Sequence, residues 1–305
     1  MKQSPSPSPP RLVVQHPDLS QEAIAAFTQR LGTAPASIRN GAPGGARMQD
    51  AGDPGARAPR VAVWEAADIG AAEVATLAET LAVDAALVPA RAALGDYRLL
   101  AFDMDSTLIP IECIDEIADY AGRKAEVAAI TEAAMRGEIA DFAESLRRRV
   151  ALLAGLDQAV LQRVFDERLR LSPGAPELLA AARRAGLSTL LVSGGFTFFT
   201  ERLQAQLGLD RARANTLEVV DGRLTGRVLG PILDADGKAR ALQEACAAIG
   251  CLPADAIALG DGANDLKMMA LAGVSVAYHA KPVVRERTTF ALTYCGLDGL
   301  LNLLA

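Results

Sequence analysis

The stretch RLLAFDMDST at residues 98–107 decides how the chain is expected to fold. Leu99 to Phe102 form an unbroken apolar run, which is typical of a strand buried on both faces of a sheet. Asp103 and Asp105 follow at once, so this strand delivers two carboxylates to its carboxyl end. Such a pair can act as nucleophile and general acid–base, although D-x-D also occurs in metal-binding loops and in plain turns.

The segments after this strand alternate between strand and helix patterns. Strands are predicted at 187–192, 256–259 and 274–277, helices at 197–207 and 265–272, and a hairpin of 217–220 with 223–228 around Asp221-Gly222. This alternation predicts an α/β fold with a parallel sheet covered on both faces, which binds its ligands at the carboxyl ends of the strands. Residues 111–170 are almost entirely helical in pattern, and we expect them to form a cap over that edge.

Length and patterning suggest more than one domain. A chain of 305 residues suggests two domains, because one domain usually takes about 100–200 residues. Residues 1–10 are a Ser-Pro repeat and predict a disordered tail. Residues 11–95 read as a small α+β domain, with strands at 12–14, 61–64 and 85–88, helices at 18–31 and 73–81, and a loose insert at 40–59. The catalytic domain is expected at 96–305.

Composition excludes several classes of function. Half of the residues are hydrophobic, which excludes a fully disordered chain, and the net charge of −6 argues against binding of nucleic acid or of an anionic membrane. No apolar run approaches the roughly 20 residues needed to span a bilayer. The four cysteines form no C-x-x-C pair, and the two histidines exclude a zinc site built from several His. We therefore expect a cytoplasmic protein with free thiols.

Three further motifs are placed to meet Asp103 and Asp105. Gly260-Asp261-Gly262-Ala263-Asn264-Asp265 follows the strand 256–259, and several carboxylates at one sheet edge repel each other unless a cation such as Mg²⁺ binds them. Ser193-Gly194-Gly195 ends another strand and offers a hydroxyl and backbone N–H groups to an anion. Lys238 opens a helix predicted at 238–249 and can pair with a phosphate oxygen. Taken singly, each motif also fits an ordinary turn or a solvated helix face.

The segment after Asp141 predicts an amphipathic helix with one charge pointing inward. At about 100° per residue, Phe142, Leu146, Val150 and Leu153 share one apolar face. Arg149 falls inside that face, whereas Arg147 and Arg148 point away from it and read as solvated surface. A buried charge needs a partner, so Arg149 is a candidate ligand-binding residue.

Together these motifs resemble the haloacid dehalogenase-like hydrolases, over about residues 97–305. Within that superfamily the chain closely resembles the phosphoserine phosphatase family. The marks are FDMDSTL at 102–108, Glu112 with IDEI at 114–117, SLRRRV at 145–150, VSGGF at 192–196, Ala214-Asn215 and DGAND at 261–265. The resemblance implies a Rossmann-like core, a helical cap inserted after the first strand, and a substrate of O-phospho-L-serine. Residues 11–95 more weakly resemble an ACT-like regulatory domain, and the insert at 40–59 departs from a compact version of it.

The resemblance also assigns roles to single residues. Asp103 would attack phosphorus to give an aspartyl-phosphate, Asp105 would act as general acid and base, and Asp265 would orient Lys238 or a metal-bound water. Mg²⁺ would be held by Asp103, the backbone carbonyl of Asp105, and Asp261. The phosphate would be bound by Ser193, Gly194, Lys238 and Asn264, the substrate carboxylate by Arg149, and its ammonium by Glu112. Met135 and Phe142 would wall the pocket, or belong to the core of the cap.

Two other functions stay open at this point. A phosphotransferase of the same superfamily would pass the phosphoryl group to another alcohol instead of to water. An amino-acid-sensing protein would rely on residues 11–95 and would need a defective catalytic half, yet all the motif residues are present. A homodimer is possible, and no other macromolecular partner is expected.

Overall fold

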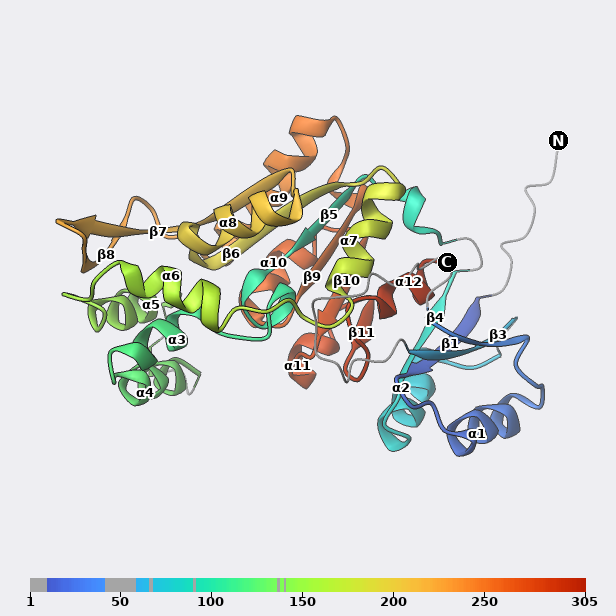
Figure 1. The fold of residues 1–305 in the computed structure, drawn as a ribbon. Helices are drawn as coiled ribbons and strands as arrows, with labels where there is room; N and C mark the ends of the chain where they lie inside the picture. Colours follow the sequence, from blue (N-terminus) through green and yellow to red (C-terminus); the bar gives the residue numbers. More distant parts are fainter. Residues whose placement is uncertain (1–9, 42–58, 66–67, 90–91, 136–137, 140) are drawn as a thin grey trace. The chain divides into compact units, whose positions relative to one another are not determined.

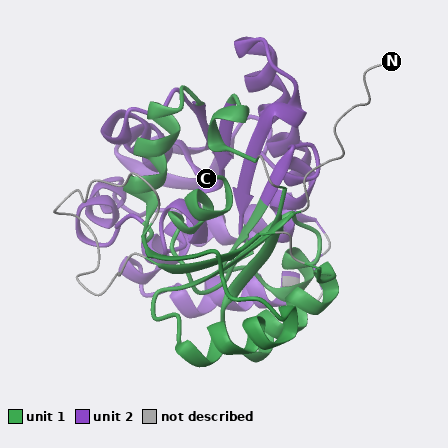
Figure 2. Cartoon of the chain, turned by 90° about the vertical axis from the view of Figure 1, so that its right-hand side faces the viewer, with its two compact units in different colours: residues 1–98, 172–187, 276–305 green, residues 99–171, 188–275 purple. Residues whose placement is uncertain are grey.

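A computed structural model describes residues 10–41, 59–65, 68–89, 92–135, 138–139 and 141–305. Figure 2 shows two compact units: residues 1–98, 172–187 and 276–305 form the first, and residues 99–171 and 188–275 form the second. One break follows Arg98, close to the domain boundary expected at 96, while two later segments fall in the first unit. The predicted tail at 1–10 and insert at 40–59 lie almost wholly outside the described residues.

The first unit contains a four-stranded antiparallel sheet of order β2-β3-β1-β4. Its elements are β1 (Arg11–His16), α1 (Gln21–Leu31), β2 (Ser37–Asn40), β3 (Arg60–Trp64), α2 (Ala71–Thr80) and β4 (Asp84–Val88). The three predicted strands and two predicted helices are confirmed, but α1 begins at Gln21, three residues after its predicted start, because the Ser20 side chain caps it. α1 ends at Gly32 in the left-handed conformation, as its sequence indicates. β2 was not predicted, because this edge strand is short and largely exposed and so carries no apolar pattern. That the sheet is ACT-like stays a prediction.

Within the first unit, this sheet is hydrogen-bonded to the C-terminal part of the chain. That part contains α11 (Pro282–Arg285), β11 (Phe290–Leu292), which pairs in parallel with the end of β10 (Val274–Tyr278), and α12 (Gly299–Leu303). The mid-chain helix α7 (Ala175–Arg184) also belongs to the first unit. The buried Asp84 carboxylate accepts hydrogen bonds from the backbone N–H groups of Thr293 (2.7 Å) and Cys295 (2.9 Å). Asn302 donates to Gln15 Oε1 at 2.8 Å. These buried hydrogen bonds fix one geometry between β1, β4 and the C-terminal segment.

The second unit is built on a sheet in which β9-β5-β6-β7-β8 lie side by side (Figure 1). Its strands are β5 (Leu99–Phe102), β6 (Ser188–Phe196), β7 (Arg211–Val220), β8 (Arg223–Leu229) and β9 (Ala256–Gly260). All neighbours pair in parallel except β7 and β8, which form the predicted hairpin. Asp221 (φ 49°) and Gly222 (φ 75°) both have positive φ at its turn, which is the backbone that a two-residue hairpin of this twist requires. The prediction of a mostly parallel α/β sheet is confirmed.

Both faces of the central strands are buried, as expected for parallel strands. Leu99 and Ala101 pack with Leu190 and Val192 of β6 against α9 (Ala235–Ile249) and α10 (Leu266–Met269), while Leu100, on the opposite face, is also fully buried. α8 (Thr197–Leu207) packs on β6 and β7. Alternate side chains of these strands point to two covered faces. Polar side chains can therefore gather at the strand ends.

Residues 112–168, here called the helical insert, contain α3 (Cys113–Tyr120), α4 (Lys124–Met135), α5 (Phe142–Ala151) and α6 (Ala159–Glu167). The β7–β8 hairpin packs on α5, and a Cβ added to Gly226 would lie only 2.9 Å from the Cβ of Ala154. Gly155 donates from its backbone to the Leu224 carbonyl at 2.8 Å, which extends this contact. Gly226 therefore allows β8 to approach the end of α5 closely.

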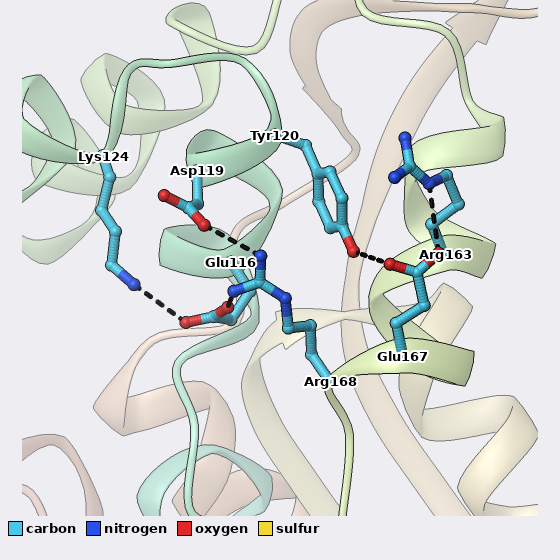
Figure 3. Close-up of polar contacts among 7 residues, drawn as sticks. All are labelled: Glu116, Asp119, Tyr120, Lys124, Arg163, Glu167 and Arg168. Carbon is cyan, nitrogen blue, oxygen red and sulfur yellow. Dashed lines mark hydrogen bonds and ion pairs between the residues drawn. The ribbon is translucent and has the colours of Figure 1, made fainter.

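A polar cluster joins α3 to α6 within the helical insert (Figure 3). Arg168 donates to Glu116 at 2.6 Å and to Asp119 at 3.0 Å, and the Tyr120 hydroxyl bonds to Glu167. The guanidinium carbons of Arg163 and Arg168 lie 4.3 and 5.0 Å from the centroid of the Tyr120 ring. Cation–π contacts and charged hydrogen bonds thus fix the distal side of α3, whose first residues reach the site described below. None of the helices in the described part of the chain has the length and apolar character to cross a bilayer.

Candidate active site

Two acidic residues lie at the ends of adjacent parallel strands. β5 ends at Phe102 and β9 at Gly260, so Asp103 and Asp261 both follow a strand end at one edge of the sheet. The Asp103 backbone N–H donates to the Leu259 carbonyl at 3.1 Å, which continues the ladder to the first residue of the loop. The predicted convergence of these two motifs is therefore observed.

Lys238 is a buried cation held between two carboxylates. Its Nζ lies 2.6 Å from Asp103 Oδ2 and 2.7 Å from Asp265 Oδ1, and all three residues are buried. Burial alone would lower the pKa of Lys238, but Asp103 and Asp265 outweigh that effect and raise it above its ordinary value. The lysine is therefore a permanent positive charge beside Asp103.

The predicted start of the lysine helix was wrong by three residues. α9 begins at Ala235 because Asp234, just before it, accepts a hydrogen bond from the Gly237 backbone N–H at 2.8 Å. Lys238 thus lies one turn inside the helix, not at its first position.

Asp103, Asp261 and Asp265 form an acidic cluster that fits a divalent cation. Each offers a carboxylate oxygen, and these oxygens lie within 4.8 Å of one another. Burial and neighbouring carboxylates raise the pKa of Asp103 well above its usual range and that of Asp261 to about 7. Thr107 donates to Asp261 Oδ1 at 3.2 Å and fixes its orientation. An all-oxygen donor set with crowded negative charge suits a hard cation such as Mg²⁺.

Asp105 lies in the turn after Asp103, in a different environment. Its Oδ1 accepts a hydrogen bond from the Cys113 backbone N–H at 3.1 Å, at the start of α3. Burial, assisted by the charge of Glu112, raises the pKa of Asp105 to about 7. A carboxyl group with this pKa can carry a proton near neutral pH, as a general acid must.

The end of β6 forms a tight loop against Asp105. Ser193 is fully buried, and its Oγ accepts a hydrogen bond from the Gly195 N–H at 2.8 Å. A Cβ added to Gly195 would lie 2.6 Å from Asp105 Oδ2, so the close approach requires glycine here. The Phe142 ring of α5 lies over Gly194, 3.0 Å from where its Cβ would be. The loop, Asp105 and the helical insert therefore meet at this point.

Glu112 and Arg149 bring the helical insert to the same place. Ser106, which has a positive φ of 54°, donates to Glu112 Oε1 at 2.7 Å. Arg149 is half-buried and its buried Nε has no hydrogen-bond partner among the described residues, whereas Arg147 and Arg148 are exposed. The inward orientation predicted for Arg149 is confirmed.

Electrostatics links Arg149 to the acidic groups of this region. Burial lowers the pKa of Arg149, and the negative charges of Glu112, Asp115 and Asp105 oppose that shift. An incompletely paired guanidinium near these carboxylates is suited to bind an anionic group of a ligand.

Two predicted residues are less sharply defined. Asn264 is half-buried in the turn after β9, with its Oδ1 close to Gly262. The side chain of Met135 lies outside the described part of the chain.

Comparison with known proteins agrees with this geometry. Residues 100–270 match the family model of the haloacid dehalogenase-like hydrolases. A phosphoserine phosphatase of Polaromonas sp. (strain JS666 / ATCC BAA-500) is 61% identical over 214 residues, which cover 69% of this chain and 91% of that protein. The chain belongs to the haloacid dehalogenase-like hydrolase family. Its predicted resemblance to the phosphoserine phosphatases is confirmed.

Solved structures of this hydrolase family extend the comparison. The crystal structure of a probable phosphoserine phosphatase from Vibrio cholerae, in unliganded form, has a TM-score of 0.77 at 37% identity, covering 96% of this chain and 86% of that one. A structure titled as a phospho-aspartyl intermediate analogue of phosphoserine phosphatase has a TM-score of 0.64 at 38% identity, covering 68% and 99%.

Some residues of this hydrolase that shape the site were not singled out from the sequence. Ser106 and Thr107 belong to the quoted D-x-D-S-T motif, but their contacts with Glu112 and Asp261 were not predicted. Asn215 was noted only as a mark of the family, although its amide bonds to the β6 loop. The motif positions were a usable signal for all three, whereas their partners depend on the tertiary fold.

Gly195→Ala is expected to lower the kcat of this hydrolase by about 10–100-fold, because the new Cβ displaces Asp105 or Ser193 from its position. The measurement is phosphate-ester hydrolysis with p-nitrophenyl phosphate. Gly95→Ala is the matched control, since a Cβ there meets open space. Unchanged kcat in Gly195→Ala would show that the close approach is not needed for turnover.

Proposed function

We propose that this hydrolase converts O-phospho-L-serine and water to L-serine and phosphate through an aspartyl-phosphate on Asp103, with Mg²⁺ as cofactor. The observation that carries the proposal is the buried Asp103–Lys238 pair beside Asp105, with Arg149 of the helical insert incompletely paired nearby. The names of the relatives above support the choice of substrate.

The first half-reaction uses two carboxyl groups with different protonation. The Asp103 carboxylate, paired with Lys238, attacks phosphorus, and the bond from phosphorus to the serine oxygen breaks. Asp105 gives its proton to that oxygen, so L-serine leaves as a neutral alcohol. The pKa of about 7 allows Asp105 to carry the proton that this role requires.

The second half-reaction returns the enzyme to its starting state. Asp105, now a carboxylate, takes a proton from a water molecule. The oxygen of that water attacks phosphorus, and the bond from phosphorus to the Asp103 oxygen breaks. Phosphate leaves and the Asp103 carboxylate is restored. In both steps the Ser193 hydroxyl, the Gly194 N–H and Lys238 bind the phosphoryl oxygens, where negative charge must be stabilised.

The acidic cluster would hold the cation through Asp103, Asp261 and the backbone carbonyl of Asp105. Bound Mg²⁺ would neutralise charge on the phosphoryl group and on the crowded carboxylates. Asp265, which accepts a hydrogen bond from Lys238, would keep the lysine directed at Asp103.

The zwitterionic end of the substrate explains the polar groups of the helical insert. Arg149 would bind the α-carboxylate and Glu112, held by Ser106, the ammonium group. A sugar phosphate offers neither group and would leave both side chains unpaired, which costs binding energy.

The test is phosphate release from O-phospho-L-serine, with Mg²⁺ and with a chelator. We expect release only with the metal ion, and kcat/KM at least about 100-fold above that for a sugar phosphate. Equal values for the two substrates would reject the amino-acid assignment. Addition of other alcohols, with analysis for new phosphate esters, distinguishes a hydrolase from a phosphotransferase.

A further inference from the structure

Asn215 is a buried side chain of β7 whose amide group is used at both ends. It is 2% exposed. Its Nδ2 donates to the Gly194 carbonyl at 2.8 Å, and its Oδ1 accepts from the Leu233 backbone N–H at 2.7 Å. An alanine here would remove the partner of the Gly194 carbonyl and of the Leu233 N–H, both of which are partly buried, and loss of such hydrogen bonds is costly.

The first of these bonds controls the peptide group that joins Gly194 to Gly195. The carbonyl of that peptide is held by Asn215, and its N–H donates to Ser193 Oγ at 2.8 Å. Glycine on both sides makes rotation of this peptide easy, because no Cβ opposes it. Rotation would break the hydrogen bond of the Gly194 carbonyl to Asn215 and would release Ser193 Oγ.

The second bond ties the same loop to the helix that supplies the lysine. Leu233 directly precedes Asp234, the residue that caps α9, and Lys238 lies in the first turns of that helix. The amide of Asn215 is planar and rigid, so it fixes the spacing between the Ser193–Gly195 loop and the start of α9. Asn215 thus supports both the Ser193–Gly195 loop and the start of the helix that carries Lys238.

We propose that Asn215 is a positioning residue that locks the Gly194–Gly195 peptide, whose N–H holds Ser193 Oγ, and so keeps the phosphate-binding Ser193 and Gly194 in register with Lys238. This inference rests on the proposed function only in that the loop and Lys238 bind a phosphoryl group. It assigns Asn215 to the phosphate end of the substrate and not to its amino-acid end.

The experiment compares Asn215→Ala and Asn215→Asp with the wild type on O-phospho-L-serine and p-nitrophenyl phosphate. We expect Asn215→Ala to lower kcat by about 10–100-fold on both substrates and to weaken inhibition by inorganic phosphate, since a misplacement of about 1 Å costs that much. In Asn215→Asp a protonated carboxyl can donate to Gly194 again, so the ratio of its kcat to that of the wild type should rise as pH falls from 8 to 5.

Asn302→Ala is the matched control, because Asn302 is another fully buried asparagine, with a hydrogen bond to Gln15 in the first unit. It should lower the melting temperature while leaving kcat within about twofold. The proposal is overturned if Asn215→Ala keeps the wild-type kcat, or if the Asn215→Asp ratio does not change with pH.

These measurements also distinguish a failure of the Asn215 proposal from a failure of the substrate assignment. A wild-type enzyme that shows no preference for O-phospho-L-serine rejects the substrate, while p-nitrophenyl phosphate still reports on Asn215. If the wild type hydrolyses neither ester, calorimetric titration with inorganic phosphate and Mg²⁺ decides, since Asn215→Ala should then bind phosphate at least about tenfold more weakly. Equal affinity would overturn the role of Asn215.

Discussion

Asp103→Asn is expected to abolish the release of phosphate from O-phospho-L-serine, with a loss in kcat of at least about 10⁴-fold. The amide has nearly the shape of the carboxylate, but it lacks the nucleophilic oxygen that would carry the phosphoryl group. It also removes one of the two negative charges that hold Lys238. Steady-state phosphate release, with the melting temperature measured in parallel, checks the prediction.

The matched control for this variant is Asp236→Asn. Asp236 lies on α9 and is exposed, with an ion pair of 2.8 Å to Lys267, so its neutralisation should change kcat by less than about twofold. An Asp103→Asn enzyme that keeps a tenth or more of the wild-type kcat would contradict the assignment of Asp103 as nucleophile.

Arg149→Met is expected to impair recognition of the amino-acid end of the substrate and to leave its phosphate end unaffected. We expect kcat/KM for O-phospho-L-serine to fall by about 10²–10⁴-fold, because the α-carboxylate loses its charged partner. With p-nitrophenyl phosphate, which has no such group, the change should stay within about threefold. Methionine keeps much of the buried length of the side chain, so packing in α5 is preserved.

Arg148→Met provides the comparison for Arg149, one position earlier on the same helix. Arg148 is exposed and pairs with Glu144 at 2.7 Å, a surface contact worth little. Its replacement should leave both substrates unaffected. Equal losses on the two substrates in Arg149→Met would instead mean that Arg149 supports the fold of the insert and does not bind the substrate.

The sequence was most informative where local patterns repeat. The apolar run before Asp103 and the Gly-rich turn after β9 predicted two acidic strand ends, and parallel pairing of β5 with β9 brings them together. The helical period of α5 gave the inward orientation of Arg149, because burial of one face follows directly from spacing.

It was least informative where a residue depends on partners that are distant along the chain. Asn215 bonds to residues 21 positions before it and 18 positions after it, and no local pattern encodes that pairing. The helix start at Ala235 was missed because the cap is made by Asp234, within a polar turn that has no apolar period. β2 was missed because an exposed edge strand needs no apolar alternation.

The path of β7 has a consequence for which changes of chain length the enzyme can accept. β7 carries Asn215, which bonds to the Ser193–Gly195 loop, and continues into the hairpin that packs on α5, the helix of Arg149. Deleting one residue between Asn215 and the turn would reverse the face of every side chain of β7 beyond it and disturb the packing of the hairpin on α5. Extra residues at the Asp221-Gly222 turn would leave this register intact, so length variation should be tolerated at the turn and excluded from the strand.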